Sequence, residues 1–324
     1  MIVRFIDEKK AEFGVEPIVT ELKAAGVAIA PSTYYAAKSR PPSTRTITDA
    51  ARTEQIKVVH QANMSVYGAR KVWAEMHRTG HPVARCTVER LMRAADLRGV
   101  RRSPARVPRT TVPGAGPDTR ADLVERSFTA TAPNKLWVAD ITYVRTFSGW
   151  VYAAFVLDVF SRYIVGWQVS RSLHTDLALD ALEMGMWNRT RAGTDLSGLI
   201  HHSDRGVQYT AIRYSQRLNE EKAVASVGSK GDSYDNAMAE AFNSLYKAEL
   251  IRHQGPWRGI DDVEIATAEY IDWYNHRRLH GQLGLIPPAE YETAHEAAAT
   301  AADTITGPGD RRSVRTKASI KAGA

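Results

Sequence analysis

Residues 136–169 read LWVADITYVRTFSGWVYAAFVLDVFSRYIVGWQV, and this stretch decides the fold. Three runs in it are rich in β-branched and aromatic residues, which favour strands, and Ser148-Gly149 and Ser161-Arg162 form short turns between them. The pattern predicts a three-stranded antiparallel meander. Its expected strands cover residues 136–144, 151–160 and 163–169.

The chain after the meander alternates between helical and strand patterns. Helices are expected at about residues 175–188, 212–221 and 260–276, with another beginning near Asp235, and short strands at 199–202 and 223–227. Strands followed by alternating helices and strands indicate layered structure. The predicted fold class of this part is therefore α/β.

The part before the meander has a different pattern. Apolar residues recur there at three- and four-residue spacing, as at Val72 and Met76, which predicts an all-helical region. Residues 101–120, RRSPARVPRTTVPGAGPDTR, have no apolar period and several residues that cannot continue a helix, so we interpret them as a linker. The whole chain of 324 residues suffices for about two domains.

Positive charge is concentrated in this upstream part. The formal net charge is +7, yet residues 62–109 hold 11 Lys and Arg against three Asp and Glu, a balance of +8 that leaves −1 for the rest. Concentrated positive charge releases condensed counterions from DNA on binding. We therefore expect DNA as a partner.

Cysteine usage and hydropathy exclude several classes of protein. Cys86 is the single cysteine, so no internal disulfide framework exists, and no cluster has the spacing of zinc ligands. The first ten residues, MIVRFIDEKK, are rich in charge, and no stretch approaches the roughly 18 apolar residues that a membrane span needs. We expect a cytoplasmic location.

A weak internal repeat lies within the helical region. Residues 21–33 match residues 75–87 at several positions, always 54 residues apart, and each copy reads helix, turn, helix. A glycine falls where the first helix should stop, and a hydroxyl residue falls where the second should be capped. The expected stops are Gly26 and Gly80, and the expected caps are Ser32, Thr33 and Thr87.

In a helix-turn-helix the second helix enters the major groove. In the second copy this helix would cover about residues 86–95. The alternative is a pair of packed helical hairpins with solvated basic faces, but two copies beside concentrated positive charge favour DNA contact. The expected contact residues are Arg70, Lys71, Arg90 and Arg93.

Three acidic residues stand out by position. Asp140 lies in an apolar strand, where a lone carboxylate is costly unless it is paired or bound to a cation. Asp204 follows a short strand, where α/β sheets carry their working groups. Glu240 lies on the next helix and shares a helical face with Lys247.

Phosphodiester chemistry explains such a set. Two divalent cations about 4 Å apart can stabilise the attacking and leaving oxygens of an in-line displacement, and hard oxygen ligands suit Mg²⁺ or Mn²⁺. The three acids therefore predict a site for two such ions. Asp158, also in an apolar strand, and Asp176 remain competitors for the same role.

Four stretches carry a resemblance to a known family. They are WVADITY (137–143), HSDRGVQY (202–209), DNAMAEAFNSLYK (235–247) and YNHRRLH (274–280). On these, residues 135–292 resemble the retroviral-integrase-type catalytic core of insertion-sequence transposases, specifically the OrfB-type protein of the large family encoded in two overlapping frames. The 35 residues between Asp204 and Glu240, and Lys247 seven positions after Glu240, match that family's spacing. Residues 67–100 are similar to the helix-turn-helix segment that precedes its core.

The resemblance implies an RNase H-like core with a mixed five-stranded sheet flanked by helices. It assigns the metal-binding acids to Asp140, Asp204 and Glu240, and leaves Asp158 as a structural residue. It also implies a bacterial, nucleoid-associated transposase that uses two Mg²⁺ or Mn²⁺ ions. The expected organisation is a helix-turn-helix-like segment (1–45), a helix-turn-helix DNA-binding domain (46–100), a Pro/Arg-rich linker (101–130), an integrase-type catalytic core (131–296) and a disordered basic tail (297–324).

In the mechanism that we expect, water or a DNA 3′-hydroxyl attacks a phosphodiester at the element's end, and the freed 3′-hydroxyl then attacks another strand. Lys247 and Asn236 would position DNA phosphates beside the acids. Arg277, Arg278 and His280 would add contacts to the DNA backbone, although a solvated helix end is the alternative for these three.

Two other functions stay open at this stage. One is a DNA-binding regulator that occupies the element's ends but has no catalytic activity. The three intact acids argue against this function. The other is a ribonuclease acting on RNA–DNA hybrids, which shares the fold but gives no reason for paired helix-turn-helix units. The expected partners are DNA ends and target DNA, further copies of the chain, and an OrfA-type protein that is separate or joined by a frameshift.

Overall fold

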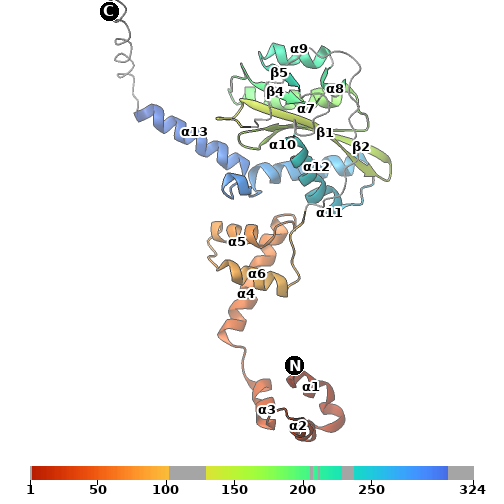
Figure 1. The fold of residues 1–324 in the computed structure, drawn as a ribbon, viewed down its shortest axis with the longest axis vertical. Helices are drawn as coiled ribbons and strands as arrows, with labels where there is room; N and C mark the ends of the chain where they lie inside the picture. The colour runs from red at the N-terminus through yellow and green to blue at the C-terminus, as the bar shows by residue number, and fades with distance from the viewer. Residues whose placement is uncertain (1, 102–128, 205–206, 211, 228–236, 306–324) are drawn as a thin grey trace, which may run out of the picture. The chain divides into compact units, whose positions relative to one another are not determined.

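The computed structural model describes residues 2–101, 129–204, 207–210, 212–227 and 237–305 (Figure 1). The chain divides into two compact units, Met1–Ile56 and Lys57–Ala324. The boundary between them falls within one helix, α4 (Thr44–Ala62).

The first unit is helical, with α1 (Ile2–Phe13), α2 (Val15–Ala24) and α3 (Pro31–Ser39) before α4. Its small core takes buried residues from α1, α2 and α3 and from the turn between α2 and α3. The buried residues are Ile6, Ile18, Val19, Ile29 and Tyr34. Asp7 on α1 accepts hydrogen bonds from the Tyr34 hydroxyl at 2.8 Å and from Lys38 at 3.0 Å, so polar contacts on α3 supplement this core.

Both copies of the sequence repeat fold as helix, turn, helix. In the second unit the pair is α5 (Ala69–Arg78) and α6 (Arg85–Ala94), which corresponds to α2 and α3 in the first unit. Gly26 and Gly80 end the first helix of each pair at φ of 84° and 79°, a conformation that only glycine adopts at little cost. The expected caps are wrong: Ala30 and Ala84 occupy the N-cap positions, without a side-chain cap hydrogen bond.

The predicted meander is confirmed as β1 (Leu136–Thr146), β2 (Gly149–Asp158) and β3 (Ile164–Ser170), all antiparallel. Two short strands, β4 (Ile200–Ser203) and β5 (Val224–Val227), add parallel to the other side of β1. The strand order is β3-β2-β1-β4-β5, which gives the mixed five-stranded sheet of the predicted α/β fold.

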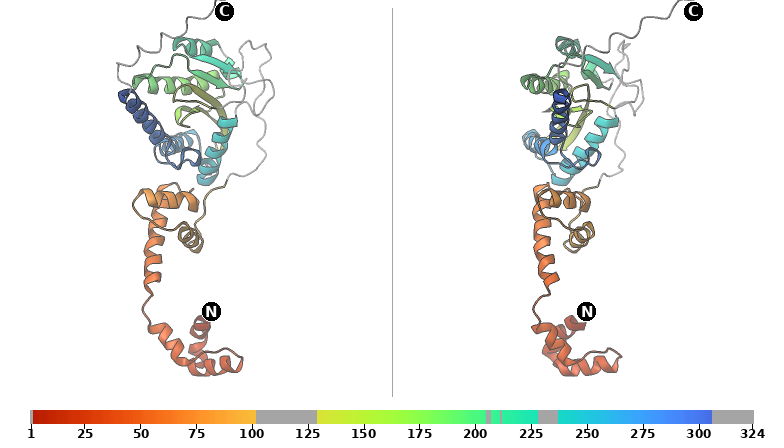
Figure 2. Two further views of the ribbon diagram at one scale, coloured as in Figure 1. Left: turned by 60° about the vertical axis from the view of Figure 1, so that its left-hand side comes forward. Right: turned by 90° about the vertical axis from the view of Figure 1, so that its left-hand side faces the viewer.

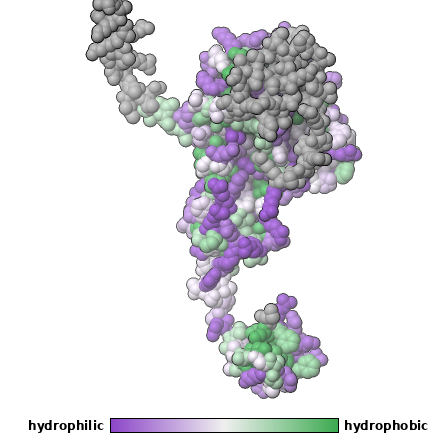
Figure 3. All heavy atoms as spheres, in the orientation of Figure 1, coloured by the Kyte–Doolittle hydropathy of each residue, from purple (hydrophilic) through white to green (hydrophobic). Residues whose placement is uncertain are grey.

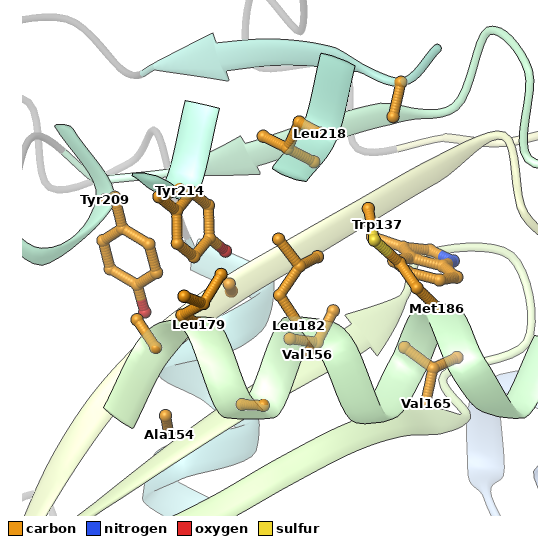
Figure 4. Packing of buried hydrophobic residues seen from close by; sticks show 14 of the residues in the cluster. Trp137, Ala154, Val156, Val165, Leu179, Leu182, Met186, Tyr209, Tyr214 and Leu218 are labelled. Atoms are coloured by element: carbon orange, nitrogen blue, oxygen red, sulfur yellow. The ribbon is translucent and has the colours of Figure 1, made fainter. Parts of the chain in front are cut away.

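One face of the sheet packs against α7 (Thr175–Arg191), α8 (Val207–Thr210) and α9 (Ile212–Glu220). Figure 4 shows this cluster, which extends from Tyr209 and Tyr214 at one end to Trp137 and Met186 at the other. Gly166 on β3 allows the close approach of α7, because a side-chain carbon there would lie 2.7 Å from the backbone nitrogen of Gly185.

The helices α10 (Ala237–Tyr246) and α12 (Ile260–His276) cover the opposite face (Figure 2). Aromatic side chains make the contacts there. Phe155 on β2 meets Phe242 and Tyr246 of α10, each with ring centroids 4.9 Å apart. The helix that begins with α10 continues as a π-helix, η1 (Lys247–Ile251), and a last short turn, α11 (Arg252–Gln254). Such widened turns are uncommon in helices and are often found at functional sites.

The chain continues through a short 3₁₀ turn, η2 (Gly281–Leu283), into α13 (Pro288–Ile305). Residues 297–305 are therefore helical, which corrects the expectation that disorder begins at 297. Arg189 on α7 holds α13 through two hydrogen bonds to Glu292, at 2.7 and 2.8 Å. Within the described ranges, no helix is both long enough and apolar enough to cross a membrane.

The helix-turn-helix of the second unit is tied to the layer that contains α12. The Tyr67 hydroxyl, just before α5, accepts a hydrogen bond of 2.7 Å from the backbone of Leu279. Trp273 on α12 donates to the Asn63 side chain at 3.1 Å, and Arg78 pairs with Glu290 on α13 at 2.6 Å. These contacts connect three separate segments of the unit.

Candidate active site

The sheet places two of the three predicted acids on adjacent strands. The parallel ladder between β1 and β4 ends at the pair Ala139 and Ser203, and Asp140 and Asp204 are the next residue on each chain segment. Neighbouring strands lie about 4.8 Å apart, so the two carboxylates are close. The two carboxylates interact electrostatically, because the charge of Asp204 raises the pKa of Asp140.

The third acid, Glu240, lies on the first turn of α10 and is exposed. One turn later on the same helix, Asn243 donates a hydrogen bond of 2.9 Å to Oδ2 of Asp140. The backbone nitrogen of Ile141 donates to Oδ1 of Asp140 at 2.8 Å. The Asp140 carboxylate is therefore held at both oxygens, and α10 is fixed against β1 at the level of the acids.

The carboxylates of this cluster repel one another. Burial, then the charges of Asp204 and Glu240, raise the pKa of Asp140 to about 8. Burial and Asp204 also raise the pKa of Glu240. Carboxylates that raise one another's pKa are stabilised by a bound divalent cation, because its charge reverses the local repulsion.

The donor set fits a hard divalent cation. Carboxylate oxygens from three separate elements are the ligands that Mg²⁺ and Mn²⁺ prefer. Oδ1 of Asn243 is buried and meets no hydrogen-bond donor among the described residues. As the side chains stand, no three histidine, cysteine, aspartate or glutamate groups within the described part of the chain are close enough to hold an ion.

Lys247 begins the π-helix beside this cluster. Its ammonium lies 4.1 Å from the centroid of the Tyr143 ring on β1. Burial lowers the pKa of Lys247, whereas the charge of Asp140 acts in the opposite direction. The structure thus brings Lys247 close to Asp140, although the two residues are 107 positions apart in the sequence.

The two competing aspartates have other environments. Asp158 is fully buried and accepts hydrogen bonds from the backbone of Asn134 at 2.6 Å and Phe160 at 2.9 Å, and from Trp137 at 3.2 Å. Asp176, on the first turn of α7, is exposed and pairs with Arg213 at 2.9 Å. Neither is among the charges that shift the pKa of Asp140.

The predicted DNA contacts on the helix-turn-helix are at the surface. Arg70 on α5 and Arg90 and Arg93 on α6 are exposed, and Lys71 lies 5.0 Å from the centroid of the Tyr67 ring. Figure 3 shows hydrophilic side chains over much of these helices. Arg93 also lines an open cleft of about 900 Å³, together with basic residues that the sequence analysis did not select, Arg98 and Arg101.

Two other predicted contacts need correction. Arg278 and His280 are buried, and the Arg278 guanidinium donates hydrogen bonds of 2.6 and 2.8 Å to Glu249 of the π-helix. A buried, paired cation is not available to a DNA phosphate. Arg277 is exposed and pairs with Asp272 at 3.0 Å, while Asn236 lies outside the described residues.

Asn243 and Tyr143 belong to the site, although no sequence motif singles them out as candidate site residues. Asn243 lies three positions after Glu240, so helical spacing alone places it near the same face. Tyr143 is three positions after Asp140 in a strand, where alternation predicts the opposite face. Lys247 connects Tyr143 to the acids, because it lies over the Tyr143 ring and interacts electrostatically with Asp140.

Comparisons with known proteins identify the families that the chain matches. The chain matches the Integrase core domain family over residues 130–233 and, in a second match of the same description, over 223–288. Residues 47–105 match the HTH-like domain family. Among solved structures, the HTLV-2 integrase catalytic core domain in complex with magnesium is 12% identical, with a TM-score of 0.39 over 51% of this chain and 99% of that one.

Two curated relatives extend over most of the chain. A Mycobacterium tuberculosis protein described as a transposase for insertion sequence element IS986/IS6110 is 53% identical over 83% of this chain and 96% of its own length. A Shigella sonnei transposase for insertion sequence element IS629 is 47% identical over 90% of this chain and 96% of its own. The chain therefore belongs to the insertion-sequence transposases, with an HTH-like domain before an integrase core domain.

Proposed function

We propose that this transposase cleaves DNA strands at the ends of its element and joins them to a target by a two-metal mechanism, with Asp140, Asp204 and Glu240 as the ligands. The observation that supports this most is the position of three carboxylates at the ends of β1 and β4 and on α10, where the charges of Asp204 and Glu240, with burial, raise the pKa of Asp140 to about 8. When bound, two Mg²⁺ or Mn²⁺ ions would stabilise the charge on the attacking and leaving oxygens.

The chain's own residues supply position and charge. Asn243 and the backbone of Ile141 hold the two oxygens of Asp140, so its remaining lone pairs point in fixed directions. Lys247 supplies a positive charge beside the acids for a phosphate oxygen of the scissile strand. The exposed basic residues of α5 and α6 would bind flanking duplex DNA, which brings the scissile bond to the acids.

The partners follow from this activity. Cutting both ends of an element together requires at least two copies of the active site, so we expect the active form to be an oligomer. We also keep the proposal that an OrfA-type protein, separate or fused by a frameshift, supplies further DNA binding. The names of the curated relatives, which are transposases of insertion sequences, support DNA ends as the substrate.

The decisive experiment replaces Asp204 with asparagine. We expect Asp204→Asn to abolish nicking of supercoiled DNA that carries the element's ends in Mg²⁺, while DNA binding measured by fluorescence anisotropy stays unchanged. Asp176→Asn is the matched control, since it removes an exposed carboxylate that pairs with Arg213. Cleavage by the Asp204 variant at the wild-type rate would exclude the proposed ligand set.

The same assay separates the two alternatives. A regulator without chemistry would bind the ends but would not nick them in Mg²⁺, and EDTA would change nothing. A ribonuclease would cut an RNA–DNA hybrid in preference to duplex DNA of the same sequence. We expect nicking of the DNA that stops in EDTA and no preference for the hybrid.

A further inference from the structure

The hairpin formed by β1 and β2 carries a row of alternating cationic and aromatic side chains. Arg145 and Trp150 form a cross-strand pair, and Tyr143, two residues from Arg145, lies on the same face of the sheet. The Arg145 guanidinium lies 5.5 Å from the Trp150 ring centroid, and the Tyr143 and Trp150 rings meet edge to face at 5.2 Å. Lys247, 4.1 Å from the Tyr143 ring centroid, completes the row.

The end of the row formed by Arg145 and Trp150 is exposed, Tyr143 and Lys247 are half-buried, and the backbone that carries the row is held in place. Trp150 is 47% exposed and Phe147, at the tip of the hairpin, is 78% exposed. The backbone of the tip is fixed, because Phe147 and Ser148 donate hydrogen bonds of 3.0 and 3.1 Å to the carbonyls of Trp257 and Arg258. Large aromatic side chains held at the surface on a fixed backbone are typical of a binding surface.

The charge around the row favours a polyanion. Arg145 and Arg252 are exposed, and neither pairs with an acid in the part of the chain that the structure describes. Arg252 also lies near enough to Lys247 to lower its pKa. A protein partner would need acidic groups to match this charge, whereas a nucleic acid supplies phosphates for the cations and bases for the aromatic faces.

Lys247 joins the row to the acids, because Tyr143 and Asp140 lie on opposite faces of β1. Lys247 interacts electrostatically with Asp140 and contacts Tyr143 at the same time. A strand whose phosphate lies at the acids would therefore pass Lys247 and meet Tyr143 and Trp150 next. A base can stack on these rings only when it is unpaired, because both of its faces are covered within a duplex.

We propose that Lys247, Tyr143, Trp150 and Arg145 form a stacking surface for unpaired nucleotides beside the phosphate that is cut. The inference rests on the proposed function for the position of that phosphate, but binding of unpaired DNA does not require cleavage. The surface holds the strand open next to the acids, and its aromatic contacts carry no preference for one base.

The test compares two DNA ligands on the full chain in EDTA, so that no cleavage occurs. One is a blunt duplex, and the other is the same duplex with a short unpaired tail that contains 2-aminopurine. Wild type should bind the tailed duplex more tightly and change the 2-aminopurine fluorescence on stacking. Trp150→Ala should weaken binding of the tailed duplex about tenfold and abolish the fluorescence change, with little effect on the blunt duplex.

Trp187→Ala is the matched control. Trp187 on α7 is 57% exposed and has the Arg191 guanidinium 4.8 Å from its ring centroid, so it offers the same chemistry outside the hairpin. This variant should behave as wild type, and Trp150→Phe should retain most of the preference for the tailed duplex. Equal effects of the two alanine variants, or loss of self-association instead of tail binding in Trp150→Ala, would overturn the proposal.

The two proposals can fail separately. If Asp204→Asn still cuts DNA, the ligand assignment fails, but the tail preference measured in EDTA still stands. If wild type cuts DNA in Mg²⁺ and shows no preference for the tailed duplex, the stacking surface fails and the ligand assignment stands.

Discussion

The guanidinium of Arg278 donates a hydrogen bond of 2.6 Å to Oε1 of Glu249 and another of 2.8 Å to Oε2, in the interior of the second unit. Arg278 is 5% exposed and Glu249 is 6% exposed. Glu249 belongs to the π-helix that begins at Lys247, and Arg278 follows the end of α12. The pair therefore fixes the turn that carries Lys247 against the C-terminal segment.

Removing one partner of this pair should be costly. We expect Arg278→Met to lower the free energy of unfolding by about 3–5 kcal/mol, because Glu249 is left as an uncompensated buried charge. Urea denaturation measures this, and the double variant Arg278→Met with Glu249→Gln should recover much of the loss. Arg277→Met, which removes an exposed pair with Asp272, should cost less than about 1 kcal/mol, and an equal cost for both single variants would contradict the buried-pair argument.

The hydroxyl of Tyr67 should stabilise the attachment of the helix-turn-helix. Tyr67→Phe removes the acceptor of the Leu279 backbone N–H, and leaving that buried group unpaired should cost about 1–3 kcal/mol of unfolding free energy. Hydrogen exchange should show faster opening at Leu279. Tyr35→Phe, at an exposed tyrosine, is the control, and unchanged exchange at Leu279 would show that the bond contributes nothing.

The approach of α7 to β3 depends on the absence of a side chain at residue 166. Gly166→Ala would place a carbon 2.7 Å from the backbone nitrogen of Gly185 and against the Ala181 carbonyl, so strand or helix must shift. We expect a loss of at least about 1–3 kcal/mol in thermal or urea unfolding. Gly281→Ala, where nothing lies within 4 Å of the added carbon, should change stability little. A wild-type stability for Gly166→Ala would show that this packing is looser than described.

Asp140 should make the stability of the metal-free chain depend on pH. Its folded pKa of about 8 lies above its ordinary value of 3.8, so its protonated form is favoured in the fold. The contribution of Asp140 to the free energy of unfolding is greatest below about pH 4. It falls as the pH rises to about 8, where the carboxylate ionises in the folded chain. Thermal unfolding in EDTA should show a smaller fall for Asp140→Asn, and Mg²⁺ should raise the midpoint of wild type more than that of the variant.

Asp176→Asn is the matched control for this measurement, because its carboxylate is exposed and paired with Arg213. It should retain both the pH dependence and the response to Mg²⁺. If Asp140→Asn and wild type respond alike to pH and Mg²⁺, the predicted environment of Asp140 is wrong.

Much of the catalytic fold follows from local patterns. The meander of β1, β2 and β3 is recognisable because β-branched and aromatic residues alternate with short turns, and α12 covers the predicted residues 260–276. The helix-turn-helix repeat is recognisable because glycine is needed at positive φ at the same point of both copies. The capping residues were wrong because Ser and Thr near a helix start do not have to occupy the N-cap.

The contacts that join distant segments could not be read from local patterns. Arg278 stands among charged neighbours and resembles a solvated helix end, but its partner Glu249 lies 29 positions earlier. Asn243 and Asp140 are 103 positions apart. The helical course of residues 297–305 was missed for the same kind of reason, since α13 is held by a contact of Glu292 with Arg189 on another helix.

The register of the pairing between β1 and β4 determines whether Asp140 and Asp204 lie on the same side of the sheet. Because the ladder ends one residue before Asp140 and Asp204, a slip of β4 by a single position would turn its aspartate to the other side of the sheet. A chain that pairs these strands out of register would therefore not bring the two proposed ligands together.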